Sequence, residues 1–372
     1  MRPYLNAVFA AGLLLLLPAA GHSEEILQDL VARLTAPPVL SAGEGFAVRL
    51  LVPPGKLFDP LVMVSAGDAV WINDDGGEEK GKGSRLLAID AQGGVSTLAG
   101  LGKLMPTVGI DIAPPGFGAY GGQVFSLAQP EVAMKGAAKN HIIQRIDPKA
   151  DFSASVFCTL PDAGGKKIPG YGLAAHFGPD HGPFANRLFA VTIYNDAVYE
   201  VSADGKCVPF IVFDGKQYSA PTMVTFTPDG ESMLVSVSAG AFDITSTAAQ
   251  EGAIVRVSAD GKLAAQPFYR GPGRPVGMAF APPGFGAYGG QLFFSDVNLY
   301  QIPVPATQPL SADGKVWRLT PEGKAVPVVS GMHNPNGLLF VHGKLWVADI
   351  NGDFIAGGRE LPDGYVVEIE AK

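Results

Sequence analysis

The sequence predicts an all-β protein, a six-bladed β-propeller of four-stranded antiparallel blades. An eleven-residue phrase, APPGFGAYGGQ, stands at residues 113–123 and recurs unchanged at 281–291, 168 residues later. A second phrase, VSADGK, stands at 201–206 and recurs at 257–262, an offset of 56. Because the longer offset is three times the shorter one, both phrases follow one period. The 48 glycines and 31 prolines among 372 residues argue against long helices, since both residues interrupt helices.

Six units follow this period, and each begins with a proline before a short apolar strand. The prolines are Pro60, Pro106, Pro169, Pro221, Pro275 and Pro335. Second strands are predicted at 69–72, 123–125, 188–191, 233–235, 292–294 and 345–347. A third strand, such as 253–257, alternates in polarity and leads through an Asp-Gly turn into a fourth. Such turns between alternating runs are typical of β-hairpins.

The chain ends leave one strand to be shared between them. The last unit, 334–372, stops after its third strand at 366–369, and residues 46–51 precede the first unit with no partner of their own. We expect residues 46–51 to supply the missing outer strand of the sixth blade. The propeller then spans 46–372 as a closed ring, which removes exposed sheet edges.

The N-terminus has the features of a secretory signal peptide over residues 1–23. Arg2 precedes an apolar run at 7–17, and small residues follow at 18–23. Eleven residues rise only about 16 Å as a helix, which is too short to span a bilayer. We expect a short helix and a linker over 24–45, no membrane span, and a periplasmic or secreted protein.

The two cysteines, Cys158 and Cys207, would then meet an oxidising compartment in which disulfides form. Pairing and two separate buried thiols are equally compatible with the sequence.

The composition excludes several classes of protein. A hydrophobic content of 47% supports a large core and excludes a disordered chain. A net charge of −8 without a basic cluster argues against a nucleic-acid partner. Hydrolase signatures of the G-x-S-x-G and H-E-x-x-H types are absent. The G-x-G-x-x-G match at 116–121 and 284–289 is interpreted as a Gly-rich link, because a strand and not a helix is predicted to follow it.

Polar side chains recur where the second strands end. These residues are Asn73, Asp74, Asn195, Asp196, Asp296, Asn298, Asp349 and Asn351, with Glu131 following the strand of unit two. One end of every blade faces the same channel mouth, so a ring of oxygen donors there could hold Ca²⁺ or Mg²⁺. The alternative is that Asn and Asp stand there because they favour turns.

Unit six contains the candidate catalyst. His333 precedes Asn334-Pro335-Asn336-Gly337 at a strand that faces the channel, and imidazole titrates near neutral pH. We therefore name His333 as a candidate general base.

The residues of unit six resemble those of known propeller families. NPNGLLF at 334–340 and GKLWVAD at 343–349 are similar to blades of NHL-type propellers and of the senescence-marker-protein/gluconolactonase group. Residues 45–60 more weakly resemble soluble quinoprotein sugar dehydrogenases. The resemblance to the lactonase group implies a divalent metal in the channel, held by a glutamate near the first blade and by Asn or Asp residues before a Gly.

Asn336 before Gly337 matches that pattern, whereas Val108, Tyr171 and Val276 stand before the other glycines. No glutamate stands at the start of unit one. The resemblance implies a cation-assisted hydrolase or lyase of lactonase type with Asn336 as a metal ligand. The oxygen donors at the strand ends add Asp349 and Asp296 as candidate ligands. The small-molecule substrate of such an enzyme would contact Tyr171, Asn195, Glu131 and Arg274.

Two alternatives stay open at this point. A quinone-dependent sugar or alcohol dehydrogenase would need cationic residues at the mouth, and Arg270 and Arg274 are the candidates. A non-catalytic propeller that binds a ligand or a protein would need no convergent ionisable groups. Val108, Tyr171 and Val276 either line an apolar throat or belong to the core between blades.

Overall fold

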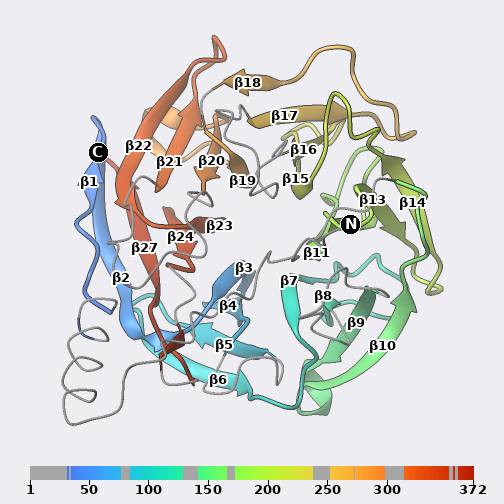
Figure 1. The fold of residues 1–372 in the computed structure, drawn as a ribbon, viewed down its shortest axis with the longest axis horizontal. Helices are drawn as coiled ribbons and strands as arrows, with labels where there is room; N and C mark the ends of the chain where they lie inside the picture. Colours follow the sequence, from blue (N-terminus) through green and yellow to red (C-terminus); the bar gives the residue numbers. More distant parts are fainter. Residues whose placement is uncertain are drawn as a thin grey trace, which may run out of the picture.

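Six antiparallel sheets surround a common centre in the computed structural model, which confirms the predicted propeller (Figure 1). The structure describes residues 32, 35–76, 84–128, 141–165, 172–237, 252–271, 273–297, 314–351, 355–356 and 359–372. The innermost strands, one per blade in chain order, are β3 (Pro60–Ala66), β7 (Thr107–Ile112), β11 (Gly172–Phe177), β15 (Pro221–Phe226), β19 (Pro275–Phe280) and β23 (Pro335–Val341). Four of them begin at a predicted proline.

The remaining strands of each blade follow outward from the centre. Blades one to three contain β4 (Ala69–Asp74), β5 (Arg85–Ile89), β6 (Val95–Ala99), β8 (Val124–Ala128), β9 (Ile142–Asp147), β10 (Ser153–Thr159), β12 (Leu188–Thr192), β13 (Ala197–Val201) and β14 (Cys207–Val212). Blades four to six contain β16 (Met233–Val237), β17 (Gly252–Val257), β18 (Tyr269–Gly271), β20 (Leu292–Asp296), β21 (Gly314–Leu319), β22 (Ala325–Met332), β24 (Lys344–Asp349) and β27 (Gly364–Ala371). A two-stranded ribbon, β25 (Ile355–Ala356) and β26 (Arg359–Glu360), lies before β27.

The N-terminal strand closes the ring as predicted. Strand β2 (Phe46–Leu57) pairs antiparallel with β27, from Phe46 opposite Ala371 to Leu57 opposite Gly364. It is longer than the predicted 46–51 because two register shifts, between Leu50 and Val52 and between Val52 and Leu57, let the pairing continue. Blade six is thus built from both ends of the chain.

A further strand, β1 (Ser41–Ala42), lies in the segment that the sequence assigned to a linker. It pairs with β22 and makes blade five a five-stranded sheet, with Ser41 opposite Ser330. Two residues are too few for a periodic pattern, so only the tertiary contact defines this strand. The predicted signal peptide and nearly all of the predicted helix lie outside the described residues. Within the described ranges, no helix is long and apolar enough to cross a membrane.

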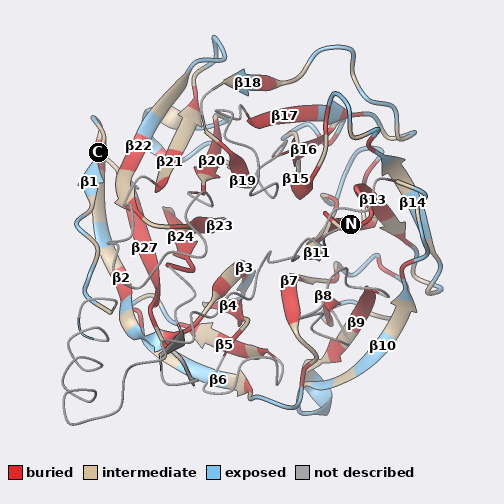
Figure 2. Ribbon diagram, viewed as in Figure 1, coloured by how far each residue is buried: buried red, intermediate tan, exposed pale blue. Residues whose placement is uncertain are grey.

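Burial falls from the centre to the rim of the ring, as Figure 2 shows. The second strands are almost entirely buried, and β8, β12 and β16 have no exposed residue. The outermost strands alternate, so that β10 exposes four of its seven residues. Such a gradient is expected when the sheets pack face to face and only the outer edge of each sheet meets water.

Each innermost strand begins with a register shift, and in three blades a polar side chain uses the amide that the shift releases. In blade five, Ser295 Oγ accepts from the backbone nitrogen of Gly277 at 2.8 Å and donates to the carbonyl oxygen of Asn336 at 2.7 Å. Because Asn336 belongs to the next blade, this hydroxyl joins neighbouring blades. Asn73 and Ser236 join blades one to two and four to five in the same way.

Close approach between the innermost strands explains the glycines that begin them. A Cβ atom on Gly277 would collide with the carbonyl oxygen of Asn336, and one on Gly337 would collide with that of Leu61. A Cβ atom on Gly109 would also lie too close to the backbone of Ala174, at 2.7 Å from its Cα atom. The Asn-Gly pair at 336–337 therefore has a packing reason for its glycine that is independent of any ligand.

The two identical Gly-rich phrases have identical structural roles. Each contributes a phenylalanine that packs between blades: Phe117 lies 4.8 Å from Phe177, and Phe285 lies 4.9 Å from Phe340, measured between ring centroids. Strands β8 and β20 follow the phrases, not helices. The interpretation of these motifs as links, not dinucleotide sites, fits this geometry.

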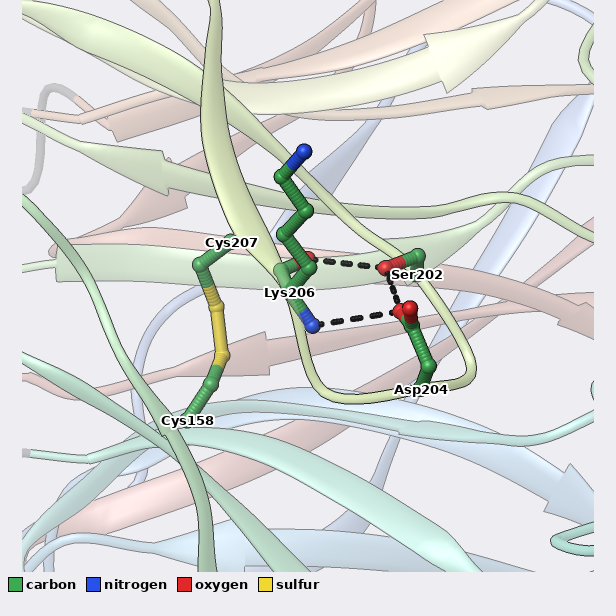
Figure 3. Close-up of a disulfide and its surroundings, with 5 residues drawn as sticks. All are labelled: Cys158, Ser202, Asp204, Lys206 and Cys207. Atoms are coloured by element: carbon green, nitrogen blue, oxygen red, sulfur yellow. Dashed lines mark hydrogen bonds between the residues drawn. A yellow bond between two sulfur atoms is a disulfide. The ribbon is translucent and has the colours of Figure 1, made fainter.

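Cys158 and Cys207 form a disulfide, which decides the alternative that the sequence left open (Figure 3). The bond joins β10 to β14, the outermost strands of blades two and three, with a Cα–Cα distance of 6.5 Å. Beside it, the turn at 202–206 is held by Ser202 Oγ, which contacts Asp204 and the carbonyl oxygen of Lys206. The two blades are thus covalently joined at the rim.

Loss of the disulfide should lower stability substantially. The cysteines are 49 residues apart, for which the chain-entropy account gives about 4 kcal/mol. We expect the Cys158→Ser/Cys207→Ser variant to unfold at a lower urea concentration, and wild-type protein treated with dithiothreitol to shift equally. An unchanged midpoint in both samples would contradict a structural role for the bond.

Removing the hydroxyl that joins blades five and six should also destabilise the ring. Ser295→Ala leaves the amide of Gly277 and the carbonyl of Asn336 buried without their partner, at a cost of about 1–3 kcal/mol. Ser155→Ala, on the exposed face of β10, is the matched control and should stay within about 0.5 kcal/mol of wild type. Equal midpoints for both variants in urea unfolding would show that the hydroxyl is dispensable.

Candidate functional site

A buried polar network surrounds the carboxylate of Asp349, where β24 ends beside the start of β23. Asp349 Oδ1 accepts hydrogen bonds from the backbone nitrogens of Asn334 at 3.0 Å and Asn351 at 2.7 Å. Asp349 Oδ2 accepts from the backbone nitrogen of His333 at 3.0 Å and from the hydroxyl of Tyr365 at 2.7 Å. Four donors therefore occupy both oxygens, an arrangement that favours the ionised carboxylate.

Tyr365 connects this carboxylate to the imidazole of His333. Its oxygen lies 3.3 Å from His333 Nδ1. Because the single phenolic hydrogen is donated to Asp349, a hydrogen bond between Tyr365 and His333 Nδ1 needs its hydrogen on Nδ1. The same phenolic oxygen also accepts from the backbone nitrogen of His333 at 3.2 Å. The tautomer that makes this bond has its lone pair on Nε2, which is the form that a general base needs.

Burial sets the protonation states of these three groups. It lowers the pKa of His333, with the charge of Asp349 opposing the shift, so the imidazole is neutral at neutral pH. Burial, reinforced by the adjacent Asp349, raises the pKa of Tyr365 well above its usual range, so the phenol keeps its hydrogen. Burial also raises the pKa of Asp349, and its donors counteract that effect.

The local sequence explains how the backbone reaches the carboxylate. Pro335 holds the residue before it in an extended conformation, which turns the amides of Asn334 and His333 toward Asp349. The same arrangement occurs at the start of two other blades. Asp74 accepts from the backbone nitrogen of Phe58 at 3.0 Å, and Asp296 accepts from that of Arg274 at 2.7 Å. The aspartates that end second strands therefore have a folding role.

The structure places two of the three predicted metal ligands, Asp349 and Asn336, in blade six and the third, Asp296, in blade five. Asp349 has no remaining lone pair, and Asn336 directs its Nδ2 at the carbonyl oxygen of Asn334, 3.2 Å away. Asp296, on blade five, accepts from Trp317 Nε1 at 3.1 Å as well as from Arg274. Across the ranges that the structure describes, no three His, Cys, Asp or Glu side chains gather in a possible metal site.

Arg274 and Asp296 make a second charged locus at the start of blade five. Arg274 is only 2% exposed, and burial lowers its pKa to about 10, so it stays charged at neutral pH. Burial raises the pKa of Asp296. The contact between Ser295 and Asn336 joins this locus to blade six, so Arg274 and His333 stand at the starts of adjoining blades.

The other predicted positions do not join these two loci. Asn195 lies in the turn after β12 of blade three, across the ring from blade six, and its backbone nitrogen donates to Thr192 Oγ1 at 3.0 Å. Arg270, unlike Arg274, is exposed and stacks over the ring of Tyr218. These two arginines therefore lie in different surroundings, not in one cationic pocket. Glu131 and Tyr171 lie outside the described residues.

The sequence pattern does not point to two residues of the site, Tyr365 and Asn334. Tyr365 lies in an ordinary alternating strand, and nothing in that pattern shows that its hydroxyl reaches Asp349. Asn334 was assigned no role from the sequence, although its backbone nitrogen donates to Asp349 Oδ1 and its Nδ2 donates to the carbonyl oxygen of Asn351. The pairing of Tyr365 with Asp349 across β27 and β24 could only have been suggested by a full strand register.

The chain shares its fold with solved propellers of different activities. No protein-family model matches it, and no curated protein matches its sequence. A gluconolactonase from Xanthomonas campestris superposes with a TM-score of 0.54 at 15% identity, covering 91% of this chain and 95% of that one. A nutrient-binding protein from Bacteroides ovatus gives 0.54 at 11% identity, with coverages of 88% and 77%. A streptogramin B lyase gives 0.50 at 12%, with coverages of 89% and 100%. At these identities the likeness shows that the chain is a six-bladed β-propeller similar in fold to gluconolactonase-like and lyase propellers.

Proposed function

We propose that the protein is an exported enzyme that acts on a small lactone or ester beside His333, with this histidine as general base. The observation that carries the proposal is the chain of contacts from Asp349 through the Tyr365 hydroxyl to His333 Nδ1. It holds one tautomer of a neutral imidazole at the mouth end of an innermost strand. Structural neighbours that are a gluconolactonase and a lyase support an enzymatic role for this fold.

The geometry indicates how the base would act. His333 Nε2 accepts a proton from the water that attacks the substrate carbonyl, or from a substrate carbon in an elimination. The imidazolium so formed keeps donating through Nδ1 to Tyr365, whose hydroxyl donates to the Asp349 carboxylate. A buried negative charge two hydrogen bonds away thereby stabilises the protonated base.

Export rests on two independent features. The first 23 residues have the charge and apolar pattern of a signal peptide. The disulfide between Cys158 and Cys207 supports the same location, because disulfides persist in oxidising compartments. Together they favour the periplasm or the extracellular medium.

The proposal does not use a metal. The resemblance to lactonases implies a cation, but both oxygens of Asp349 already accept hydrogen bonds from protein donors. We therefore derive no step through a metal at these positions. Activity with and without a chelator, followed by addition of Ca²⁺ or Mg²⁺, measures any contribution from ligands elsewhere.

Substitution of His333 should remove catalysis without unfolding the protein. We expect wild-type protein to release acid from members of a panel of sugar and aliphatic lactones, and His333→Asn to lower kcat/KM by about 10²–10⁴. His342→Asn is the matched control, because His342 is exposed in a turn with a φ of 52°, a conformation that Asn tolerates. Acid release at constant pH, with urea unfolding of each variant, gives the measurement.

The pH profile provides a second readout. Because burial lowers the pKa of His333, its basic form persists below the ordinary value of 6.5, so the acidic limb of kcat/KM should lie below pH 6.5. Lactone binding without turnover by wild-type protein would instead favour a binding propeller. Equal activity of His333→Asn and wild type would refute the assignment of the base.

A further inference from the structure

Three innermost strands bring a histidine, a carboxylate and a thioether together away from the His333 site. His176 of β11 lies between Asp111 of β7 and Met223 of β15. Its Nε2 is 3.0 Å from Met223 Sδ, and its Nδ1 is 3.5 Å from Asp111 Oδ2. His176 and Asp111 stand near the ends of their strands, whereas His333 precedes the start of β23, so the two sites lie toward opposite ends of the channel.

The carboxylate of this cluster is fixed in place. Asp111 Oδ2 accepts from the backbone nitrogen of Phe177 at 2.8 Å, and Oδ1 accepts from that of Ile112 at 2.7 Å. Both bonds hold the carboxylate toward the Nδ1 side of the imidazole. A carboxylate beside one ring nitrogen is the usual partner of a histidine whose other nitrogen binds a metal.

Solvent reaches two of the three side chains of the cluster. The side chains of His176 and Asp111 are 23% and 22% exposed, whereas Met223 is 4% exposed and belongs to the core. An ion could therefore enter beside the imidazole and be held against the buried sulfur.

The imidazole of His176 lies between two polar neighbours, Asp111 and Met223, but a neutral ring cannot donate a hydrogen to both. A neutral ring has one N–H, which can face Asp111 or Met223 but not both. If Nδ1 donates to the carboxylate, the Nε2 lone pair faces the sulfur lone pairs at 3.0 Å, a repulsive contact. A positively charged species between nitrogen and sulfur removes that repulsion.

We propose that His176 Nε2 and Met223 Sδ bind a soft monovalent cation of the copper(I) class, with Asp111 orienting the ring. Imidazole and thioether are ligands that copper(I) prefers, and a d¹⁰ monovalent ion is satisfied by two of them. Hard cations need several oxygens, and the oxygens of Asp111 already accept backbone amides. Zinc sites hold more nitrogen, sulfur or carboxylate ligands than this cluster offers.

The side chains can open far enough to admit the ion. Metal–nitrogen and metal–sulfur bonds of roughly 2.0 and 2.3 Å, the lengths seen for zinc, span up to about 4.3 Å when the two ligands are opposed. The present separation is 3.0 Å, so the sulfur must move by roughly 1 Å. Methionine does this by rotating about its three side-chain bonds.

Competition with bicinchoninate, a copper(I) chelator, tests the site in purified, exported wild-type protein. Ascorbate keeps copper reduced, and a thiol assay before and after the titration verifies that Cys158 and Cys207 remain paired. We expect one copper(I) per chain to be withheld from the chelator. The ¹³C shift of the Met223 methyl should move on binding, which gives a readout that does not depend on activity.

Matched variants separate ligation from structure. Met223→Leu conserves volume and should cost less than about 1.5 kcal/mol, and it and His176→Asn should each weaken copper binding by more than about 100-fold. Asp111→Asn should weaken it by about 10–100-fold, as loss of an orienting partner does. Met278→Leu, in the equivalent innermost strand of blade five, is the control and should leave binding unchanged.

Two results would overturn the proposal. One is wild-type protein that withholds no copper from the chelator, which would leave the contact as an N–H···S hydrogen bond only. The other is copper binding that survives both His176→Asn and Met223→Leu, which would place the ion elsewhere. Thermal melting of every variant verifies that each remains folded.

Discussion

The pairing of β2 with β27 is the constraint on which the candidate site depends. Strand β27 is held between β2 and β24, and Tyr365 lies on it directly opposite Asp349. Strand β2, which comes early in the chain, therefore fixes the strand that carries the tyrosine. Closure also places the innermost strands of blades six and one in contact, where Gly337 lies against the backbone of Leu61. Without the N-terminal strand, β27 would be an open sheet edge and the phenol would have no fixed position.

Polar residues near the channel mouth first serve the fold. The aspartates that end β4, β20 and β24 hold the backbone at the start of the same blade. Asn73, Ser236 and Ser295 join one blade to the next. These contacts satisfy amides and carbonyls that the register shifts would otherwise leave buried and unpaired. The geometry of the repeated blade thus accounts for most of the Asp, Asn and Ser residues near the channel mouth.

The candidate site is formed by residues that blade six has in addition to the shared arrangement. Blade six keeps the aspartate of the common arrangement and adds a histidine before the proline and a tyrosine across the sheet. The same carboxylate that holds the backbone then also orients the imidazole. Blade five keeps the aspartate but places a buried arginine beside it, which gives charge without a titratable base near neutral pH. The candidate site is therefore defined by the residues that differ between blades, whereas the residues that the blades share serve the fold.

The sequence by itself determined the fold class, the blade number and the closure of the ring, because repeats and alternating polarity are properties of the chain order. It also identified His333 as a candidate base, since that residue stands beside a strand start that the repeat marks. Tertiary structure alone decided that Cys158 pairs with Cys207, that β1 joins blade five, and that Tyr365 links Asp349 to His333. It also showed which backbone and side-chain donors occupy the oxygens of Asp349, and that Asn336 Nδ2 donates to the carbonyl oxygen of Asn334. These features depend on the strand register and on which lone pairs already accept hydrogen bonds. The sequence pattern alone specifies neither the register nor that occupancy.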